Sequence, residues 1–368
     1  MAGVAKDFEK RDWLLVAAAA TLIAGYLGIG YFSVESKASW YDEKLAASQL
    51  AQRAMASVRA EKLARGIAID KTADVNETGM IGLRWSGMTT TLGVLEAKRT
   101  STNPDFAAVA VDLLKQCGAK SGDRVAINLS GSFPALGLSV LGAAQALELH
   151  PVAIASLGAS MWGANDPAFT WIDMEQVVRE SGLMRTGMVA VSLGGALDVG
   201  KDMDDAVRER LRARIRDANI ALVDEPDFER NLEKRMALYL ADGLPACFIN
   251  VGGNLASGGA EADSGALRPG LIRSLDEAGT RIGGLMHAFL TRKVPVIHLL
   301  DLKALAASTG LPYDPAPMPV PGSGRIFRAT QYDRTYIAVL LAVAFALLAA
   351  YIRLGRKNAR LPEGGQAR

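Results

Sequence analysis

Two long uncharged runs stand near the ends of the 368-residue chain, at 13–32 and at 335–352. Each is close to the length of roughly twenty apolar residues that crosses the hydrocarbon core of a bilayer as a helix. Aromatic residues near the ends of each run suit the interfaces of a membrane. The pattern predicts two transmembrane helices. A cleaved signal peptide is the alternative for the first run, but the "SVESKAS" behind it is a poor cleavage site.

Basic residues flank both runs on their outer sides. The tail 353–368 is rich in arginine, and the segment 1–12 carries Lys6, Lys10 and Arg11. Short flanks rich in Lys and Arg remain in the cytoplasm. We therefore expect both termini to be cytoplasmic and the residues between the two spans to lie outside the cytoplasm, in the periplasm if the cell has two membranes.

Short apolar runs alternate with amphipathic stretches between about residues 70 and 312. Strands are expected at 124–129, 152–157, 187–193, 246–251 and 294–298. Helices are expected at 104–117, 135–149, 174–181, 202–219, 228–242 and 270–292. Strands separated by helices indicate parallel βαβ units. The sequence thus predicts one α/β domain over 70–312, with a mostly parallel sheet and helices on both faces.

Two segments connect this domain to the predicted spans. Residues 33–69 are rich in Ala, Leu, Lys, Glu and Arg, and a helix capped by Ser39 is expected to end at Gly66. This helix is interpreted as a stalk or docking helix, with a dimerising coil as the alternative. Residues 313–334 begin with a proline-rich stretch, which predicts a semi-rigid linker.

Four predicted strands end in similar loops of small and polar residues, in "INLSGSFPAL", "IASLGASMWGAND", "VSLGGALDVG" and "INVGGNLASGG". Parallel α/β sheets bind ligands beyond the carboxyl ends of their strands, where such loops meet. One hypothesis is a shared polar pocket; the alternative is that strand-to-helix turns need small residues in any case. The expected ligand-binding residues are Asn128, Ser130, Ser132, Ser160, Trp162, Asn165, Asn250, Gly252, Gly253, Asn254 and Ser257.

A serine hydrolase is a second hypothesis for these loops. None of the loop serines stands in the G-x-S-x-G frame of an α/β-hydrolase. A base is also required, and His298, which follows the last strand, is the best placed histidine. The catalytic candidates are therefore Ser130 or Ser132 with His298 and with Asp166 or Asp301. A histidine at a strand end can equally be a structural residue.

Composition excludes several classes of protein. The net charge is only +2, which gives no field to attract nucleic acid. The three histidines and two cysteines form no metal-ligand motif, and no Walker lysine or G-x-G-x-x-G opens a helix, so neither metal nor cofactor is expected. Cys117 and Cys247 are either a disulfide or two buried thiols. The arginines of "RERLRARIR" suggest a salt-bridged surface helix, with a track for an anionic polymer as the alternative.

Several of these stretches resemble the family of poly-gamma-glutamate system proteins. The resemblance rests on "SGSFPALG", "WGANDPAFTWIDME", "NVGGNLASGG" and "VIHLLDLKALAASTGLPYDPAPMPVPGSG", placed between two spans, and covers most of the chain. It implies a protein of the bacterial inner (cytoplasmic) membrane that accompanies the membrane subunits of a poly-gamma-glutamate synthase, in capsule or polymer production. The family name implies a pathway and carries no established catalytic residues.

The resemblance leaves three functions open. The chain is expected to be an accessory subunit of poly-gamma-glutamate biosynthesis or export that binds the anionic polymer or supports the synthase. The first alternative is a membrane-anchored serine amidase or transpeptidase acting on the polymer. The second is a non-catalytic scaffold.

Overall fold

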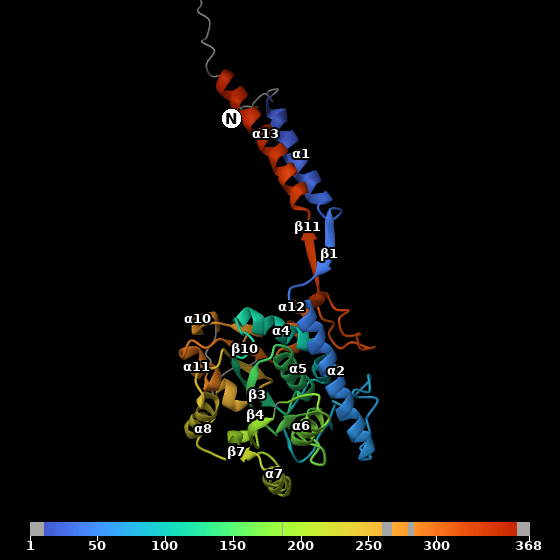
Figure 1. Ribbon diagram of the computed structural model, residues 1–368, viewed down its shortest axis with the longest axis vertical. Coiled ribbons are helices and arrows are strands. Elements are labelled where there is room, and N and C mark those ends of the chain that lie inside the picture. The colour runs from blue at the N-terminus through green and yellow to red at the C-terminus, as the bar shows by residue number, and fades with distance from the viewer. Residues whose placement is uncertain (1–10, 186, 260–266, 279–282, 359–368) are drawn as a thin grey trace, which may run out of the picture. The chain divides into compact units, whose positions relative to one another are not determined.

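The computed structural model describes residues 11–185, 187–259, 267–278 and 283–358, and divides the chain into two compact units. The smaller unit comprises the two ends of the chain, up to Lys37 and from Arg328 onward. The larger unit runs from Ala38 to Phe327. Each is described by itself, with the element labels of Figure 1.

The smaller unit is a pair of helices followed by a two-stranded ribbon. Helix α1 (Asp12–Gly28) lies beside α13 (Arg334–Asn358), and β1 (Ser33–Lys37) pairs antiparallel with β11 (Arg328–Tyr332) (Figure 1). The helices approach closely at Gly25, because a Cβ there would lie 2.3 Å from the Leu340 side chain. Small residues of this kind permit tight packing of apolar helices.

In the described part of the chain, one helix is long and apolar enough to cross a membrane, namely Arg334–Leu354 with a mean hydropathy of 2.5. Helix α1 is shorter than expected: it has 17 residues and ends at Gly28, so the run 13–32 is not helical throughout. At 1.5 Å per residue it spans about 26 Å, slightly less than the roughly 30 Å of a bilayer core. The two-span prediction is thus supported by length at the C-terminal helix alone.

The larger unit contains the remaining elements. Its helices are α2 (Tyr41–Ala64), α3 (Leu95–Ser101), α4 (Phe106–Cys117), α5 (Pro134–Ala146), α6 (Trp171–Glu180), η1 (Ala196–Asp198), α7 (Asp205–Asp217), α8 (Phe228–Leu240), α9 (Leu255–Gly258), α10 (Leu275–Ala278), α11 (Gly284–Thr291), α12 (Leu302–Thr309) and η2 (Arg325–Phe327). Its strands are β2 (Thr89–Thr91), β3 (Arg124–Ser130), β4 (His150–Ser156), β5 (Ala159–Ser160), β6 (Met188–Ser192), β7 (Ala221–Leu222), β8 (Cys247–Val251), β9 (Gly270–Ile272) and β10 (Val296–Leu299).

Seven of these strands form one sheet in the order β7-β6-β4-β3-β8-β10-β9. All neighbours are parallel except β9, which is antiparallel to β10. The chain moves outward from β3 to β7 and returns to the other side of β3 at β8. It then forms β9 at the far edge and comes back to place β10 between β8 and β9. The mixed α/β fold with a mostly parallel sheet is therefore confirmed. The direction of winding reverses between β3 and β8, and such a reversal opens a crevice at the carboxyl ends of the two strands.

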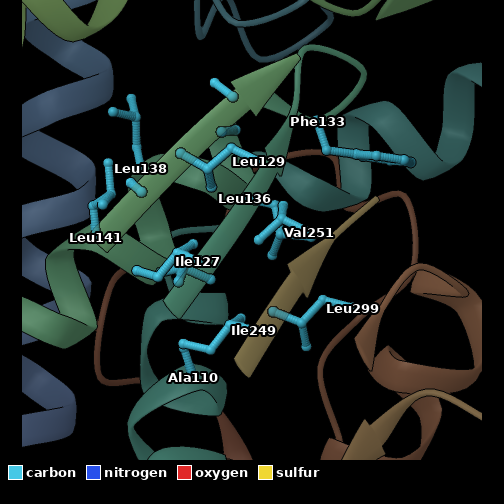
Figure 2. Packing of buried hydrophobic residues seen from close by; sticks show 14 of the residues in the cluster. Ala110, Ile127, Leu129, Phe133, Leu136, Leu138, Leu141, Ile249, Val251 and Leu299 are labelled. Atoms are coloured by element: carbon cyan, nitrogen blue, oxygen red, sulfur yellow. The ribbon is translucent and has the colours of Figure 1, made fainter. Parts of the chain in front are cut away.

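The sheet is buried on both faces because alternate residues of each strand point to opposite sides. Ile127 and Leu129 of β3 pack on one face with Ile249 and Val251 of β8, under Leu136 of α5 (Figure 2). Ala126 and Phe248 immediately precede Ile127 and Ile249, so they face the other side of the sheet. They belong to a second core beneath α8 and α11. There the Phe248 ring stacks on Phe289 at a centroid distance of 4.5 Å.

The greater part of each connecting segment, 38–69 and 313–327, belongs to the larger unit. Helix α2 packs on α4 and α5 through a buried face of Ala47, Ala51, Ala54 and Val58, so it docks on the core instead of forming a free stalk. The segment 313–327 is not a linker. Asp314 accepts two hydrogen bonds from the Arg99 guanidinium, at 2.6 and 2.5 Å. The unit is consequently wider than the predicted 70–312.

The single helix predicted at 270–292 is wrong. The structure has strand β9, the short helix α10 and then helix α11 in this range, apart from 279–282, which lie outside the described residues. Gly283 and Gly284 start α11 afresh, and Gly284 has a φ of +56°, a left-handed value that breaks a continuous helix. The arginine-rich helix α7 does lie at the surface, and its pairs include Arg208 with Asp205 at 2.6 Å.

A buried carboxyl group holds the C-terminal segment of the larger unit in place. Asp105, which is 1% exposed, accepts a hydrogen bond from the Gly322 N–H at 3.2 Å. Burial raises the pKa of Asp105 from 3.8 to about 6, because a charged carboxylate loses hydration there. The stability that this group contributes is complete below pH 3.8 and is lost as the pH rises through 6.

We therefore expect Asp105→Asn to stabilise the protein more at pH 8 than at pH 4, by about 2–3 kcal/mol in the free energy of unfolding. Denaturant unfolding of the full chain in detergent at both pH values measures this difference. Asp242→Asn, at a side chain that is 81% exposed, is the control. An equal effect of Asp105→Asn at both pH values would contradict the expectation.

Candidate functional site

A cavity of about 910 Å³ opens where the direction of the sheet reverses. Its walls include Ser132 and Phe133, which follow β3, and Gly253 and Asn254, which follow β8. The turn after β3 is short because Pro134 begins α5 at its first position, where a missing N–H costs nothing. The turn after β8 is closed by Asn254, whose side chain accepts a hydrogen bond from the Ser257 N–H at 2.8 Å.

Other walls of the cavity come from more distant parts of the chain. Lys98 stands on α3 and Ser160 on β5, while Asp301 and Lys303 stand at the start of α12 and Tyr313 follows it. Of the expected binding residues, Ser132, Ser160, Gly253 and Asn254 are thus brought together at one cavity. The candidate Asp301 lines it too, but its carboxylate caps α12 by accepting from the Ala304 N–H at 3.0 Å.

The other expected binding residues of the strands are buried beneath the cavity. Asn128 donates to the side chains of Asn250, at 3.2 Å, and Ser257, at 2.8 Å. Asn250 in turn lies 3.0 Å from Nδ1 of His298, so a polar row crosses three neighbouring strands. Gly252, also buried, has a φ of +79°, and a Cβ there would lie only 3.1 Å from the Ser130 side chain.

An ion pair without solvent exposure anchors this row. Arg235 of α8 meets Asp198 at 2.6 Å, with side-chain exposures of 0% and 1%. The Arg235 guanidinium also donates to Asn128, at 3.2 Å, and to the Ser192 hydroxyl, at 2.7 Å. Asp198 has a φ of +60°, an uncommon conformation for a residue with a side chain, and its carboxylate also accepts a hydrogen bond from the Ser192 hydroxyl at 2.8 Å. The expected ligands Asn128 and Asn250 are therefore structural.

The loop that contains Trp162 and Asn165 has a structural role as well. Asn165 accepts from the Leu83 N–H and donates to the Leu83 carbonyl, both at 2.8 Å. Trp162 exchanges backbone hydrogen bonds with the same segment, donating to Leu83 at 2.8 Å. Gly82 is required there, since a Cβ would lie 1.8 Å from the Gly163 carbonyl oxygen. Trp162 and Asn165 therefore hold the segment around Leu83 by hydrogen bonds, and neither residue lines the cavity.

The expected serine–histidine–aspartate arrangement is not assembled. His298 is fully buried against Asn250, whereas Ser130 accepts a hydrogen bond from the Ser132 N–H at 3.2 Å. Asp166, which follows Asn165, accepts a hydrogen bond from the Ala168 N–H at 2.9 Å. In the strand register His298 stands opposite Asn250 and level with Asn128, so strand β8 lies between it and the strand that carries Ser130.

Sequence reasoning missed Lys98. Its Nζ donates to the Ser160 hydroxyl at 2.6 Å and to the Ser132 carbonyl oxygen, and it lies 3.8 Å from the centre of the Phe133 ring. The Lys98 residue is 2% exposed, and no salt bridge of the described residues includes it. Burial without a carboxylate partner lowers the pKa of Lys98 to about 7.

The same corner of the cavity is closed by two further contacts. The Ser160 N–H donates to the Ser132 hydroxyl at 2.9 Å, which ties the two serines together. Gly93 lies against them, because a Cβ there would be 3.3 Å from both Cε of Lys98 and the Ser160 hydroxyl oxygen. Only the absence of a side chain at position 93 lets the loop approach this closely. The signal in the sequence was weak: Lys98 stands in "LEAKRTS", a pattern typical of an exposed helix.

Comparison with known proteins gives no match: no family model, curated protein or solved structure matches this chain. The fold is that of a doubly wound α/β protein. Its polar cavity lies at the switch point, which is the place between β3 and β8 where the direction of winding reverses. Function is inferred from that cavity.

The depressed pKa of Lys98 predicts a dependence of stability on pH. Between pH 7 and 10.5 the folded protein binds fewer protons at this amine than the unfolded chain. The stability that it contributes is therefore complete above 10.5 and is lost as the pH falls to 7. Lys98→Met should stabilise the protein relative to the wild type by about 2–3 kcal/mol more at pH 7 than at pH 9.

Denaturant unfolding of the full chain in detergent at pH 7, 8 and 9 checks this expectation. Lys120→Met is the control, since Lys120 is exposed and precedes β3 at the opposite edge of the sheet. If the free energies of unfolding of Lys98→Met and the wild type differ by the same amount at all three pH values, the amine is charged in the folded protein.

Proposed function

We propose that this chain is a membrane-anchored accessory subunit of poly-gamma-glutamate biosynthesis or export whose α/β unit binds the polymer. The observation that carries the proposal is the switch-point cavity, which combines two lysine side chains with hydroxyl and amide groups. Its volume of about 910 Å³ lies at the upper end of the range for ligand sites, so it has room for more than one residue of a chain.

The chemistry of the cavity suits a ligand with a carboxylate on each unit. Lys303 of α12 is exposed on its wall, and its Nζ lies 6.0 Å from the centre of the Tyr313 ring. Asn254, which follows β8, presents an amide group at the same cavity, and its Nδ2 donates to the Ser156 hydroxyl at 3.2 Å. An ammonium group and amide N–H groups are the donors that carboxylates accept from.

The apolar helices support a membrane location within the same proposal. In this proposal α13 and α1 both cross the membrane, and the larger unit lies outside the cytoplasm near the synthase subunits. Helix α1 falls a few ångströms short of a bilayer core, a mismatch that local thinning or a helix partner can accommodate. The close packing of α1 and α13 at Gly25 would supply such a partner.

Binding is tested with a γ-linked glutamate oligomer of about ten residues, titrated calorimetrically into the full chain in detergent. We expect Lys303→Met to weaken binding by about three- to tenfold, because one carboxylate loses its cation. Added salt should weaken binding by the wild type. The exposed Lys120→Met should bind as the wild type does. An equal loss of affinity in Lys303→Met and Lys120→Met would reject the proposed ligand. So would the absence of binding by the wild type.

The proposed topology is tested by labelling. Lys201 is exposed in the turn after η1, and Lys201→Cys should react with a membrane-impermeant maleimide in intact spheroplasts. The wild type measures the background from Cys117 and Cys247. Reaction that occurs only after lysis would place the larger unit in the cytoplasm and would overturn the proposed location.

A further inference from the structure

The contacts of Lys98 point to chemistry as well as binding. We propose that Ser160 and Lys98 form a nucleophile–base pair that cleaves or transfers an amide bond of a chain held in the cavity. The inference rests on the proposed function for the identity of the substrate, a γ-linked glutamyl amide, and on geometry for the pair itself. It assigns the nucleophile to Ser160, which the sequence suggests only as a binding residue.

The first support is the distance between the two groups. Nζ of Lys98 lies 2.6 Å from the Ser160 hydroxyl oxygen, within the range required of a nucleophile and its base. The Ser132 carbonyl oxygen accepts a second hydrogen bond from the same nitrogen. A neutral amine has two N–H donors and one lone pair, so it can donate to Ser132 while the lone pair accepts the Ser160 proton.

The second support is the surroundings of the amine. Lysines acting as general bases are buried away from carboxylates, since a carboxylate partner would keep them protonated. Lys98 is 2% exposed and packs on the Phe133 ring, and within the described part of the chain its hydrogen bonds include no carboxylate. Lys62 is a useful contrast: it is also buried, but Asp166 and Asp74 act on its charge, and its Nζ donates to the Gly79 carbonyl.

The third support is that Ser160 is held in place at the wall of the cavity. Strand β5 pairs with β2 through Ser160 and Thr91, and the Ser160 N–H donates to the Ser132 hydroxyl at 2.9 Å. Ser132 is thus a positioning residue. Gly93 packs against the pair, since a Cβ there would lie 2.6 Å from the Met161 carbonyl oxygen and 3.3 Å from the Ser160 hydroxyl oxygen. Both serines and Lys98 line the cavity, so a bound chain reaches the pair directly.

The reaction balances without a metal or cofactor. The Ser160 oxygen attacks the carbonyl carbon of the amide while its proton passes to Nζ of Lys98. The tetrahedral intermediate collapses, the C–N bond breaks, and Lys98 returns the proton to the departing amine. The acyl group is then an ester on Ser160. Water, with Lys98 again accepting a proton, releases it as a carboxylate, and an amine in place of water transfers it to a new amide.

The test is covalent labelling of the full chain in detergent with a fluorophosphonate, read by mass spectrometry of the Ser160 peptide. We expect Ser160 to be labelled at a rate that rises with pH through about 7, as Lys98 loses its proton. Ser160→Ala removes the label, and Lys98→Met slows labelling about 100-fold or more, because the base is lost. Two matched variants should label as the wild type does: Lys62→Met removes a buried lysine elsewhere, and Ser139→Ala removes a buried serine of α5.

Three results would overturn the proposal. They are an unlabelled Ser160 in the wild type, equal labelling in Lys98→Met and the wild type, and a labelling rate independent of pH between 6 and 9. The pH profile uses the wild type alone, so it decides the question even if Lys98→Met does not fold. Oligomer binding is measured on the same preparation. Binding without labelling rejects the pair and keeps the binding function, whereas labelling without binding keeps the pair and rejects the polymer as its substrate.

Discussion

The guanidinium of Arg235 and the carboxylate of Asp198 meet at 2.6 Å with almost no contact with water. Enclosing two charges costs several kcal/mol per ion, which is offset only when each charge has a complete set of hydrogen bonds. Arg235 reaches that condition through Asn128 of β3, Ser192 of β6 and Asn231 of its own helix. The positions of α8, the turn after β6 and the central strands are therefore coupled, because a shift of any one leaves a buried charge unpaired.

The pleat of the sheet separates this network from the cavity. Asn128, Asn250 and His298 stand on the face covered by α8 and α9. The groups that reach the cavity lie in turns after strands, in the neighbouring small sheet or, for Lys98, on α3. Burial of the first set, in a satisfied hydrogen-bond network, rigidifies the central strands beneath the cavity. Burial in the second set, at Lys98, changes the chemistry of the amine instead. Two groups of polar residues that are close in sequence thus have different roles.

The sequence predicts the sheet well, because β3, β4, β6, β8 and β10 are apolar runs bounded by turn residues. It fails where the packing surface carries no strong hydrophobic signal. The buried face of α2 includes three alanines, a serine and two lysines, and Lys98 contacts serines 34 and 62 residues away in the sequence. For the candidate site, Ser132, Ser160, Gly253 and Asn254 were predictable from the strand ends. The asparagines beneath them were misplaced because adjacent residues of a strand face opposite sides.

The two ends of the larger unit meet each other. The Ala38 N–H donates to the Phe327 carbonyl at 3.0 Å, and Asp314, near the end of the unit, clamps Arg99, the neighbour of Lys98. During synthesis the ribosome must therefore release nearly the whole unit before the wall that carries Lys98 is secured. A chain truncated before Tyr313 would keep the strands of the sheet. It would lack the Tyr313 wall of the cavity and the Asp314 carboxylate that holds Arg99. Assembly of the site is in this sense a late event in the biogenesis of the protein, coupled to the arrival of the last residues of the unit.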